Sequence, residues 1–515
     1  MSEHSTHDDF REQFLKNLFG NIAFFVVSIL IGILLVPYFI DTLGIAAYGL
    51  IPLATSLMSY VTLITDSLNI AVSRFLTVDL QKKDYKKANK TFNTALFGLS
   101  GIIALLIPVV VLLSYYAPKI FNVPAGQESE VIVLFLGVSA AVLIRSWSSN
   151  FTVSLFAYNR LDLQNMLNII ALFVQVSLIV LLFTTFSPQL GYIGCAYLVS
   201  SIVFLFGAIL LSKRINPNLS VKPQDFDRSR LHELTQMGWW SIVNQIGSLL
   251  FLQIELIIVN LLFGATVAGE YAVVLLWATI IRGIAGTLAG VLNPMILTYY
   301  AKEKFDQIIQ VSKSAVKGLG LFIALPIGFI CGFAPIILTL WVGPEFAHLA
   351  PLMWVLTLPL VINLCVLPLF IITVAFNKVR IPGVVTLFMG FGNVILAISL
   401  PLLFGWSYYG VAIAGAIILT LKNSFFTPWY ATKIMNISAN TFTKSMISGL
   451  LATVIIAGFS AIIGTIFIPS SWINLAIFCG IISIVYIIIV WYIGFNQYER
   501  EIFTSYIPKK VRLSE

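Results

Sequence analysis

The stretch LFGNIAFFVVSILIGILLVPYFI, residues 18–40, decides the fold class. A helix needs roughly 20 apolar residues to cross the hydrocarbon core of a bilayer, and this stretch contains no Asp, Glu, Lys or Arg. Because backbone groups inside a bilayer must be bonded within their own segment, the stretch is predicted to be a membrane-spanning helix. It lacks a small-residue cleavage site, so it is not predicted to be a removed signal peptide.

Thirteen further apolar runs follow, and each is predicted to be a span. Their ranges are 45–65, 92–114, 131–156, 166–186, 191–211, 237–263, 272–293, 315–339, 351–375, 383–404, 409–431, 446–468 and 472–495. Hydrophobic residues make up 59% of the chain and charged residues 10%, whereas soluble domains carry about 25% charged residues. The sequence therefore predicts an all-α polytopic membrane protein with 14 transmembrane helices.

The basic residues predict the orientation of these helices. If the N-terminus lies inside, 26 of the 30 Lys and Arg residues fall in inner segments, and only Lys119 lies outside. The positive-inside rule then predicts two cytoplasmic termini and a multi-pass protein of the plasma (inner) membrane. The net charge of +8 comes from short loops rather than from one soluble face, so nucleic acid is not a predicted partner. Residues 5–17 are predicted to form a short interfacial helix before the first span.

The chain also repeats itself at offsets between 217 and 223 residues. The matched features are Tyr48 and Tyr271, Ala117-Pro118 and Ala334-Pro335, Asn159-Arg160 and Asn377-Lys378, and Gly191 and Gly410. Each repeat has six spans and starts inside, which predicts two parallel six-helix lobes plus two extra C-terminal helices. The predicted parts are a cytoplasmic N-terminal segment 1–17, an N-lobe 18–211, a polar cytoplasmic linker 212–235, a C-lobe 236–432, the extra helices 433–495 and a cytoplasmic tail 496–515.

Residues 43–76, LGIAAYGLIPLATSLMSYVTLITDSLNIAVSRFL, carry two short motifs, L-G-x-x-x-Y-G-L and A-x-S-R-F-L. With the arrangement of spans, they resemble the O-antigen-type (Wzx-like) polysaccharide flippases of the multidrug/oligosaccharidyl-lipid/polysaccharide exporter superfamily. The resemblance implies two lobes around a cationic central cavity lined by spans one, two, seven and eight. It also implies movement of an undecaprenyl-pyrophosphate-linked oligosaccharide from the inner to the outer leaflet during polysaccharide biosynthesis for the cell envelope.

Ionisable side chains within spans cost about 2.5–3.5 kcal/mol each to insert, so they usually mark a transport pathway. Arg282 lies near the middle of the eighth span, followed by Gly286, Gly290 and Asn293 at helical spacing. This pattern predicts a cation on a face of small residues, and a guanidinium suits a two-point grip on a diphosphate. The resemblance places a functional arginine of the cavity at Arg282. The alternative is a structural ion pair with Glu255.

Three further basic residues are predicted to contact the cargo. Arg145 in the fourth span aligns with Ser149 and Thr152 in a polar stripe. Lys422 in the twelfth span either faces the cavity or reaches to water along its flexible stem. Arg74 ends the second span, where it either meets a lipid phosphate at the cytoplasmic leaflet or simply follows the positive-inside rule.

Two carboxylates are predicted to bind a coupling ion or to form ion pairs. Glu255 in the seventh span shares a face with Asn244 and Ser248, and it fits a partner of Arg282 or a coupling site for H⁺ or Na⁺. Asp66 in the second span shares a face with Asn69, and a solvated structural role is the alternative for it. No other cofactor is predicted.

Enzymatic chemistry and metal binding find no support in the sequence. It contains no G-x-x-x-x-G-K-[ST] motif for ATP and no H-E-x-x-H motif, and its four histidines lie at span edges or in loops, so no catalytic triad is predicted. The four cysteines lie inside apolar runs without C-x-x-C spacing, which predicts small buried hydrophobes rather than disulfides or zinc ligands. The chain is therefore predicted to be a transporter without catalytic or metal-binding residues.

The predicted cargo and partners follow from the charges within the spans. Three cations outnumber two acids there, which favours an anionic lipid-linked oligosaccharide over the organic cations of a multidrug exporter, the first alternative. The second alternative is a membrane glycosyltransferase or polymerase, against which the short outer loops argue. Predicted partners are the lipid-linked oligosaccharide, membrane lipids and a glycan polymerase or other polysaccharide assembly proteins.

Overall fold

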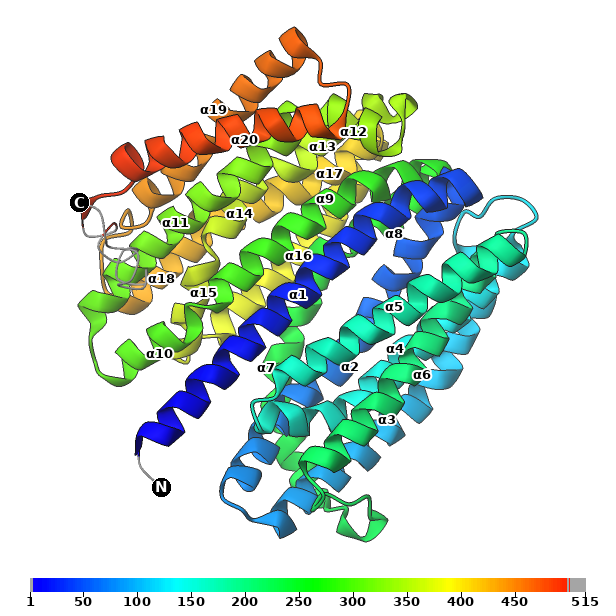
Figure 1. The fold of residues 1–515 in the computed structure, drawn as a ribbon, viewed down its shortest axis with the longest axis vertical. Coiled ribbons are helices and arrows are strands. Elements are labelled where there is room, and N and C mark those ends of the chain that lie inside the picture. Colours follow the sequence, from blue (N-terminus) through cyan, green and yellow to red (C-terminus); the bar gives the residue numbers. More distant parts are fainter. Residues whose placement is uncertain (1–2, 498–499, 501–515) are drawn as a thin grey trace. The chain divides into compact units, whose positions relative to one another are not determined.

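The fold was analysed in a computed structural model, which describes residues 3–497 and residue 500. The described chain is helical throughout its ordered elements (Figure 1). The helices as far as the middle of the chain are α1 (Glu3–Leu43), α2 (Ile45–Gln81), α3 (Tyr85–Ile120), α4 (Glu128–Ala157), α5 (Leu161–Thr185), α6 (Leu190–Ile215), α7 (Arg228–Leu252), α8 (Ile254–Phe263) and α9 (Ala265–Gly290).

The remaining helices are shorter on average, because several spans are interrupted. They are α10 (Asn293–Ala301), α11 (Phe305–Gly332), α12 (Ala334–Val342), α13 (Ala350–Thr357), α14 (Leu360–Cys365), α15 (Leu367–Ala375), α16 (Arg380–Phe404), α17 (Ser407–Leu421), α18 (Thr427–Met435), α19 (Thr443–Phe467) and α20 (Trp472–Ile489). Short 3₁₀ turns lie at Pro223–Asp225 and Pro344–Leu349, and π-helical turns at Lys422–Phe426 and Val490–Gly494.

The predicted membrane-spanning architecture is confirmed. Thirteen helical segments among the described residues are long and apolar enough to cross a bilayer. A fourteenth span is the pair Ile242–Leu252 and Ile254–Phe263, which is bent by 41° at Gln253. All fourteen coincide with predicted runs, because a run of apolar side chains in lipid has no stable alternative to the helix.

The contacts divide the chain into two units. Unit 1 comprises Met1–Ala272 and Gly383–Val394, and unit 2 comprises Val273–Pro382 and Ile395–Glu515. The bounds of these two units differ from those of the predicted N-lobe and C-lobe, and the lobes remain a prediction. Each unit is described by itself below.

The closest packing in unit 1 joins α4 and α6, which run side by side in Figure 1. A Cβ atom added to Gly137 on α4 would lie 2.3 Å from the carbonyl oxygen of Gly194 on α6. Only glycine permits this approach of two backbones, and small residues at helix crossings are typical of membrane proteins. The helices α2, α3 and α5 complete the bundle around this pair.

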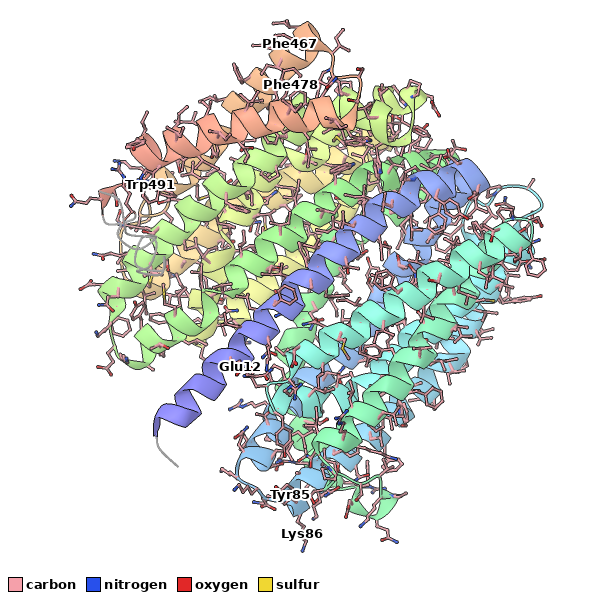
Figure 2. The ribbon with its side chains drawn as sticks, in the orientation of Figure 1. Glu12, Tyr85, Lys86, Phe467, Phe478 and Trp491 are labelled. Carbon is pink, nitrogen blue, oxygen red and sulfur yellow. The ribbon has the colours of Figure 1, made fainter. Side chains whose placement is uncertain are left out.

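In unit 2 the most extensive helix pair is α11 with α19. Gly320 and Gly449 face each other at this crossing, and a Cβ atom on Gly449 would lie 2.9 Å from the backbone of Gly320. The helix α20 follows α19, and the rings of Phe467 and Phe478 meet near their connection, with centroids 5.4 Å apart (Figure 2).

The turns between helices repeat along the chain. Residues with positive φ recur in matched pairs at offsets of 217 to 220 residues: Gly44 and Gly264, Lys83 and Glu303, Gly126 and Gly343, Asn159 and Asn377. Gly44 begins α2 with φ of 85°, and Gly264 lies before α9 with φ of 90°. A left-handed conformation is uncommon for residues other than glycine, so its recurrence at equivalent turns supports the internal repeat seen in the sequence.

Two segments differ from their predicted local structure. The predicted interfacial helix 5–17 is continuous with the first span, since α1 runs without a break from Glu3 to Leu43. The tenth span, predicted as one run, consists of α13, α14 and α15, with breaks at Leu358–Pro359 and Val366. Proline lacks an N–H donor and disfavours a helical residue before it, which explains the first break.

Candidate functional site

Arg145 projects from α4 toward α5 and α6 inside unit 1. Its Nη1 donates a 3.2 Å hydrogen bond to Oδ1 of Asn168 on α5, and its guanidinium carbon lies 4.5 Å from the ring centroid of Phe204 on α6. Both partners are neutral. The ring attracts the cation by about 0.5–2 kcal/mol without neutralising it. Among the ion pairs of the described residues, none includes Arg145.

The polar residues predicted to form a stripe with Arg145 have different hydrogen-bond partners. The hydroxyl of Ser149 donates a 2.8 Å hydrogen bond to Oδ1 of Asn69 on α2. Thr152 donates to the carbonyl of Ser149 on its own helix at 3.0 Å. The hydroxyls thus hold α4 to α2 and to itself, whereas the longer arginine side chain reaches α5 and α6, and the shared polar stripe stays a prediction.

Lys422 lies at the first residue of the π-helical turn in the twelfth span. The residue is 6% exposed, and its Nζ lies 4.9 Å from the ring centroid of Phe370 on α15. The alternative of a stem that reaches to water is therefore wrong. A π-turn in a long helix is unfavourable locally and frequently marks a functional site.

A network of neutral polar groups follows Lys422 through unit 2. Asn423 donates from Nδ2 to the carbonyl and side-chain oxygens of Asn363 on α14, both at 3.3 Å. Thr427 donates to Oδ1 of Asn423 at 3.2 Å, and Asn363 donates to the hydroxyl of Thr420 at 3.4 Å. These bonds satisfy the side chains where the tenth and twelfth spans depart from regular α-helix. This network was not predicted from the sequence, although amides within an apolar run were the available signal.

The two units thus hold their buried cations in a reciprocal manner. In unit 1 the fourth span supplies the cation, Arg145, and the sixth supplies the ring, Phe204. In unit 2 the twelfth span supplies the cation, Lys422, and the tenth supplies the ring, Phe370. Each unit therefore carries a positive group deep within its helices and beside an aromatic face.

Glu255 lies at the break in the seventh span. It is in the first turn of α8, is 3% exposed, and accepts a 2.7 Å hydrogen bond from the hydroxyl of Tyr271. A helix N-terminus favours a carboxylate, so the break itself helps to hold this charge in a buried position. The predicted common face with Asn244 and Ser248 was wrong, because the helix bends between Ser248 and Glu255.

Arg282 lies on α9 and is partly buried. A Cβ atom added to Gly286 or Gly290 would meet no atom within 4 Å, so packing does not require glycine at either position. The small-residue face ends at Gly290, because α9 stops there and Asn293 begins α10. The continuous stripe predicted from Arg282 to Asn293 was therefore wrong at its last member, whereas the role of Arg282 stays a prediction.

The two candidates in the second span lie at different depths. The predicted second span covers residues 45–65, while the helix α2 continues to Gln81. Arg74 is exposed on this extension, which suits a position beside lipid headgroups. The side chain of Asp66 lies outside the part of the chain that the structure describes, so its predicted roles remain open.

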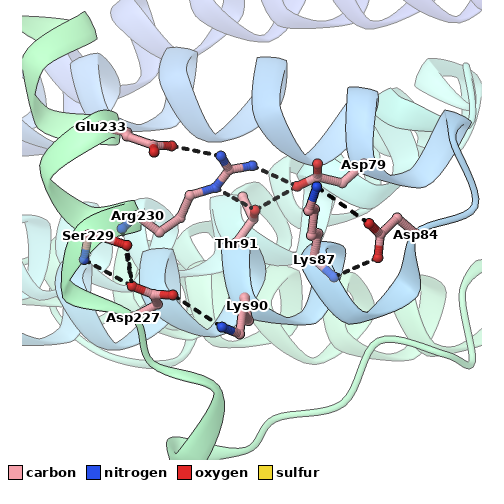
Figure 3. A network of polar contacts seen from close by, with 9 residues as sticks. All are labelled: Asp79, Asp84, Lys87, Lys90, Thr91, Asp227, Ser229, Arg230 and Glu233. Carbon is pink, nitrogen blue, oxygen red and sulfur yellow. Dashed lines mark hydrogen bonds and ion pairs between the residues drawn. The ribbon is translucent and has the colours of Figure 1, made fainter.

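The predicted linker is bonded to α2 and α3 (Figure 3). Arg230 donates to Asp79 at 2.8 Å, to Glu233 at 2.7 Å and to the hydroxyl of Thr91 at 3.0 Å. Asp227 accepts from Lys90 at 3.2 Å. Hydrogen bonds from the Ser229 hydroxyl, from Lys90 and from backbone N–H groups lower the pKa of Asp227 to about 2. Ion pairs and hydrogen bonds therefore hold this end of the predicted linker against α2 and α3.

The described part of the chain contains no cluster of side chains that could bind a metal ion. No three His, Cys, Asp or Glu side chains gather there in a way that could hold a metal ion. The four cysteines are unpaired thiols.

Comparison with solved structures shows which fold this is. The chain is similar to the eukaryotic MATE transporter AtDTX14, with a TM-score of 0.59 and 14% identity over 86% of this chain and 99% of that one. It is also similar to a mutant of the Vibrio cholerae MATE transporter VcmN, with a TM-score of 0.58 and 16% identity over 84% of this chain and 97% of that one. These similarities show the MATE-like fold.

Comparison of sequences shows the family. Residues 14–300 match the model of a family described as polysaccharide biosynthesis protein. The chain is 33% identical over 442 residues to the uncharacterized membrane protein EpsK of Bacillus subtilis (strain 168), covering 86% of this chain and 88% of EpsK. The chain therefore belongs to the polysaccharide biosynthesis protein family and is a multi-pass membrane protein with a MATE-like fold.

Proposed function

We propose that this transporter is a flippase for an oligosaccharide linked to undecaprenyl pyrophosphate, which it moves from the cytoplasmic to the outer leaflet. Alternating access carries the charged headgroup across, while the lipid tail stays in the bilayer. The protein resides in the plasma membrane with both termini in the cytoplasm, the orientation in which 26 of the 30 basic residues lie inside. It acts as a transporter and not as an enzyme.

The observation that carries this proposal is the environment of Arg145. Its guanidinium lies within a span against an amide and an aromatic ring. A buried charge costs free energy unless it is paired, so an anionic group that reaches Arg145 gains a strong interaction. A diphosphate offers oxygens that match the planar donors of a guanidinium. A cationic drug would instead be repelled there.

Further basic residues extend this path. Lys422 supplies a second buried cation beside Phe370, and Arg282 lies within the eighth span. Arg74, exposed on the extension of α2, receives the phosphates at the cytoplasmic leaflet. Each of these cations attracts the phosphates of the headgroup.

Coupling to an ion gradient supplies the driving force, because the sequence lacks an ATP-binding motif of the P-loop type. Glu255 is the first candidate for the H⁺ or Na⁺ site, since it is a buried carboxylate at a helix break. Asp66 is the second candidate. The glycan polymerase and other assembly proteins that use the flipped lipid are the proposed partners.

The test measures surface glycan in cells that depend on this protein. Arg145→Ala is expected to abolish surface glycan and to accumulate the lipid-linked precursor, whereas Arg145→Lys retains part of the activity because an ammonium makes a single-point contact. Lys119→Ala, which removes an exposed cation outside the predicted spans, is the matched control. Normal surface glycan in Arg145→Ala, at a normal membrane level of the protein, would refute the proposal.

Export of organic cations is the second candidate function, and the fold likeness to MATE transporters favours it. One of the similar structures is that of the MATE multidrug transporter DinF-BH. Efflux of a cationic dye by proteoliposomes that contain the purified protein would support this candidate. Formation of a glycosidic bond by the purified protein would instead support an enzyme.

A further inference from the structure

A pocket of about 530 Å³ lies in unit 2 between α11 and α19. Its wall on α11 consists of four residues on one helix face, Gln310, Lys313, Ser314 and Lys317. Lys444 and Ser445 from the first turn of α19, with Asn496, complete the lining. The lining residues are polar or basic, and none is acidic.

The residues of this α11–α19 pocket suit an anion. Lys313 and Lys444 supply two ammonium groups from facing helices, and hydroxyl and amide groups from Ser314, Ser445 and Gln310 lie in the same wall. The N-terminus of α19, a helix of 25 residues, adds its backbone N–H groups and the positive end of its dipole. The ring centroid of Phe495 lies 5.9 Å from Nζ of Lys317.

The equivalent face of unit 1 shows what such a site holds. A shift of 220 residues, the spacing of Lys83 and Glu303, places Lys90, Asn93 and Thr94 of α3 on Gln310, Lys313 and Ser314 of α11. In unit 1 this face binds the linker. Lys90 pairs with Asp227 at 3.2 Å (Figure 3), and Thr94 accepts from the backbone N–H of Asp227 at 2.9 Å. A carboxylate of the chain itself thus neutralises this face.

No carboxylate of the described chain takes the place of Asp227 in unit 2. The segment that leads into α19 brings Lys444 to the face of α11, so a second cation stands where unit 1 has an acid. The ion pairs among the described residues include neither Lys313 nor Lys444. The described lining of this pocket therefore carries positive charge without a carboxylate of its own.

We propose that the α11–α19 pocket binds the phosphate of an anionic phospholipid headgroup at the cytoplasmic leaflet. The apolar surface beside the pocket fits a lipid rather than a free anion, because Ile447 and Leu451 are exposed on the next turns of α19. Basic pockets between spans on the cytoplasmic side bind anionic headgroups in other membrane proteins. The lining includes neither Arg145 nor Lys422, so the site does not depend on the proposed cargo.

Native mass spectrometry of the purified full chain tests the site with two lipids, phosphatidylglycerol and phosphatidylcholine. The double variant Lys313→Gln/Lys444→Gln is expected to weaken binding of phosphatidylglycerol on the order of 30-fold, because each lysine near a headgroup contributes about fivefold. Binding of phosphatidylcholine should not change. The matched control is Lys302→Gln/Lys304→Gln, which removes the same charge from the exposed turn before α11.

Four outcomes would overturn the proposal. The first is an equal loss of phosphatidylglycerol binding in the control and the pocket variant, and the second is equal binding of the two lipids by the natural chain. The third is binding of inorganic pyrophosphate as tight as that of phosphatidylglycerol. The fourth is lipid binding that appears only in the variant Glu499→Gln/Glu501→Gln. The third outcome would make a free anion the ligand, and the fourth would make carboxylates of the tail the occupant. A melting temperature within a few degrees of the natural chain verifies that each variant is folded.

Discussion

The helices α3 and α11 begin after equivalent turns, yet their charges are balanced differently. On α3, Lys90 pairs with Asp227 of the linker, and the neighbouring Arg230 pairs with Asp79. On α11, Lys313 faces a second lysine, Lys444. The repeat in backbone conformation therefore does not extend to the balance of charge. In unit 1 the carboxylate of Asp227 neutralises the basic face of α3. In unit 2 the α11–α19 pocket stays basic and is proposed to bind an external anion.

Among the variants that test this comparison, Asp79→Ala should cause the largest loss of unfolding free energy. Asp79 accepts hydrogen bonds from Arg230 at 2.8 Å and from Thr91 at 2.7 Å, and its side chain is 9% exposed. Removing one partner leaves a guanidinium that is mostly buried, which costs about 3 kcal/mol of unfolding free energy. Thermal unfolding in detergent, followed by tryptophan fluorescence, measures the loss.

Glu233→Gln is the control for this prediction. Glu233 also pairs with Arg230, but its side chain is 53% exposed, so its loss should cost less than about 1 kcal/mol. Equal destabilisation by both variants would mean that burial does not set the strength of these ion pairs, and the account of a closed face in unit 1 would be wrong.

The helix crossings give the next largest effect. A Cβ atom on Gly137 would lie 2.3 Å from a backbone oxygen of α6, so Gly137→Ala should destabilise unit 1 by about 2 kcal/mol. A Cβ atom on Gly320 in unit 2 would lie 3.3 Å from the side chain of Cys365, which can adjust. Gly320→Ala should change the stability by less than about 1 kcal/mol, since alanine also favours the helix. The reverse order of melting temperatures would contradict this difference between the units.

The fold was largely predictable because the bilayer leaves few alternatives. An apolar run such as residues 18–40 must be a helix in lipid, and every predicted span is present. The interruptions within spans were harder to predict. The bend at Gln253 lies beside Glu255, and the π-turn begins at Lys422 and Asn423. Polar residues therefore lie at both places, but the length and mean hydropathy of a whole run do not show that its helix is interrupted there.

The candidate site was predicted less completely, because a sequence position gives depth but not the neighbours of a side chain. Arg145 was identified from its charge within a span, but its partners Asn168 and Phe204 lie on other helices. Lys422 was expected to have a choice between cavity and water, and only packing against Phe370 decides against water. The lysines of α11 were used to predict orientation, whereas the pocket that they line depends on the approach of α19.

The reciprocal cations provide a third prediction, with an effect on transport rather than on folding. Lys422→Met retains the length of the side chain and removes its charge, so the rate of glycan export should fall at least about tenfold if the ammonium contacts the cargo. The melting temperature should stay the same or rise, because a buried unpaired charge is costly. Unchanged export with a lower melting temperature would instead make Lys422 a structural residue.

The smallest expected effect concerns the charge of Asp227. Its pKa is lowered to about 2 by hydrogen bonds from Ser229, from Lys90 and from backbone N–H groups. A lowered pKa in the folded state means that the stabilisation is complete above the ordinary aspartate pKa of about 4 and is lost as the pH falls toward 2. Asp227→Asn keeps an acceptor for the N-terminus of α7 and removes the charge.

The natural chain should therefore melt slightly above Asp227→Asn at pH 7, and the two should converge as the pH falls from about 4 to 2. In unit 2, Ser445→Ala should show no such convergence, because the α11–α19 pocket contains no carboxylate of the described chain. If the two melting temperatures still differ at pH 2, the charge of Asp227 does not account for the stability of its contact with α3.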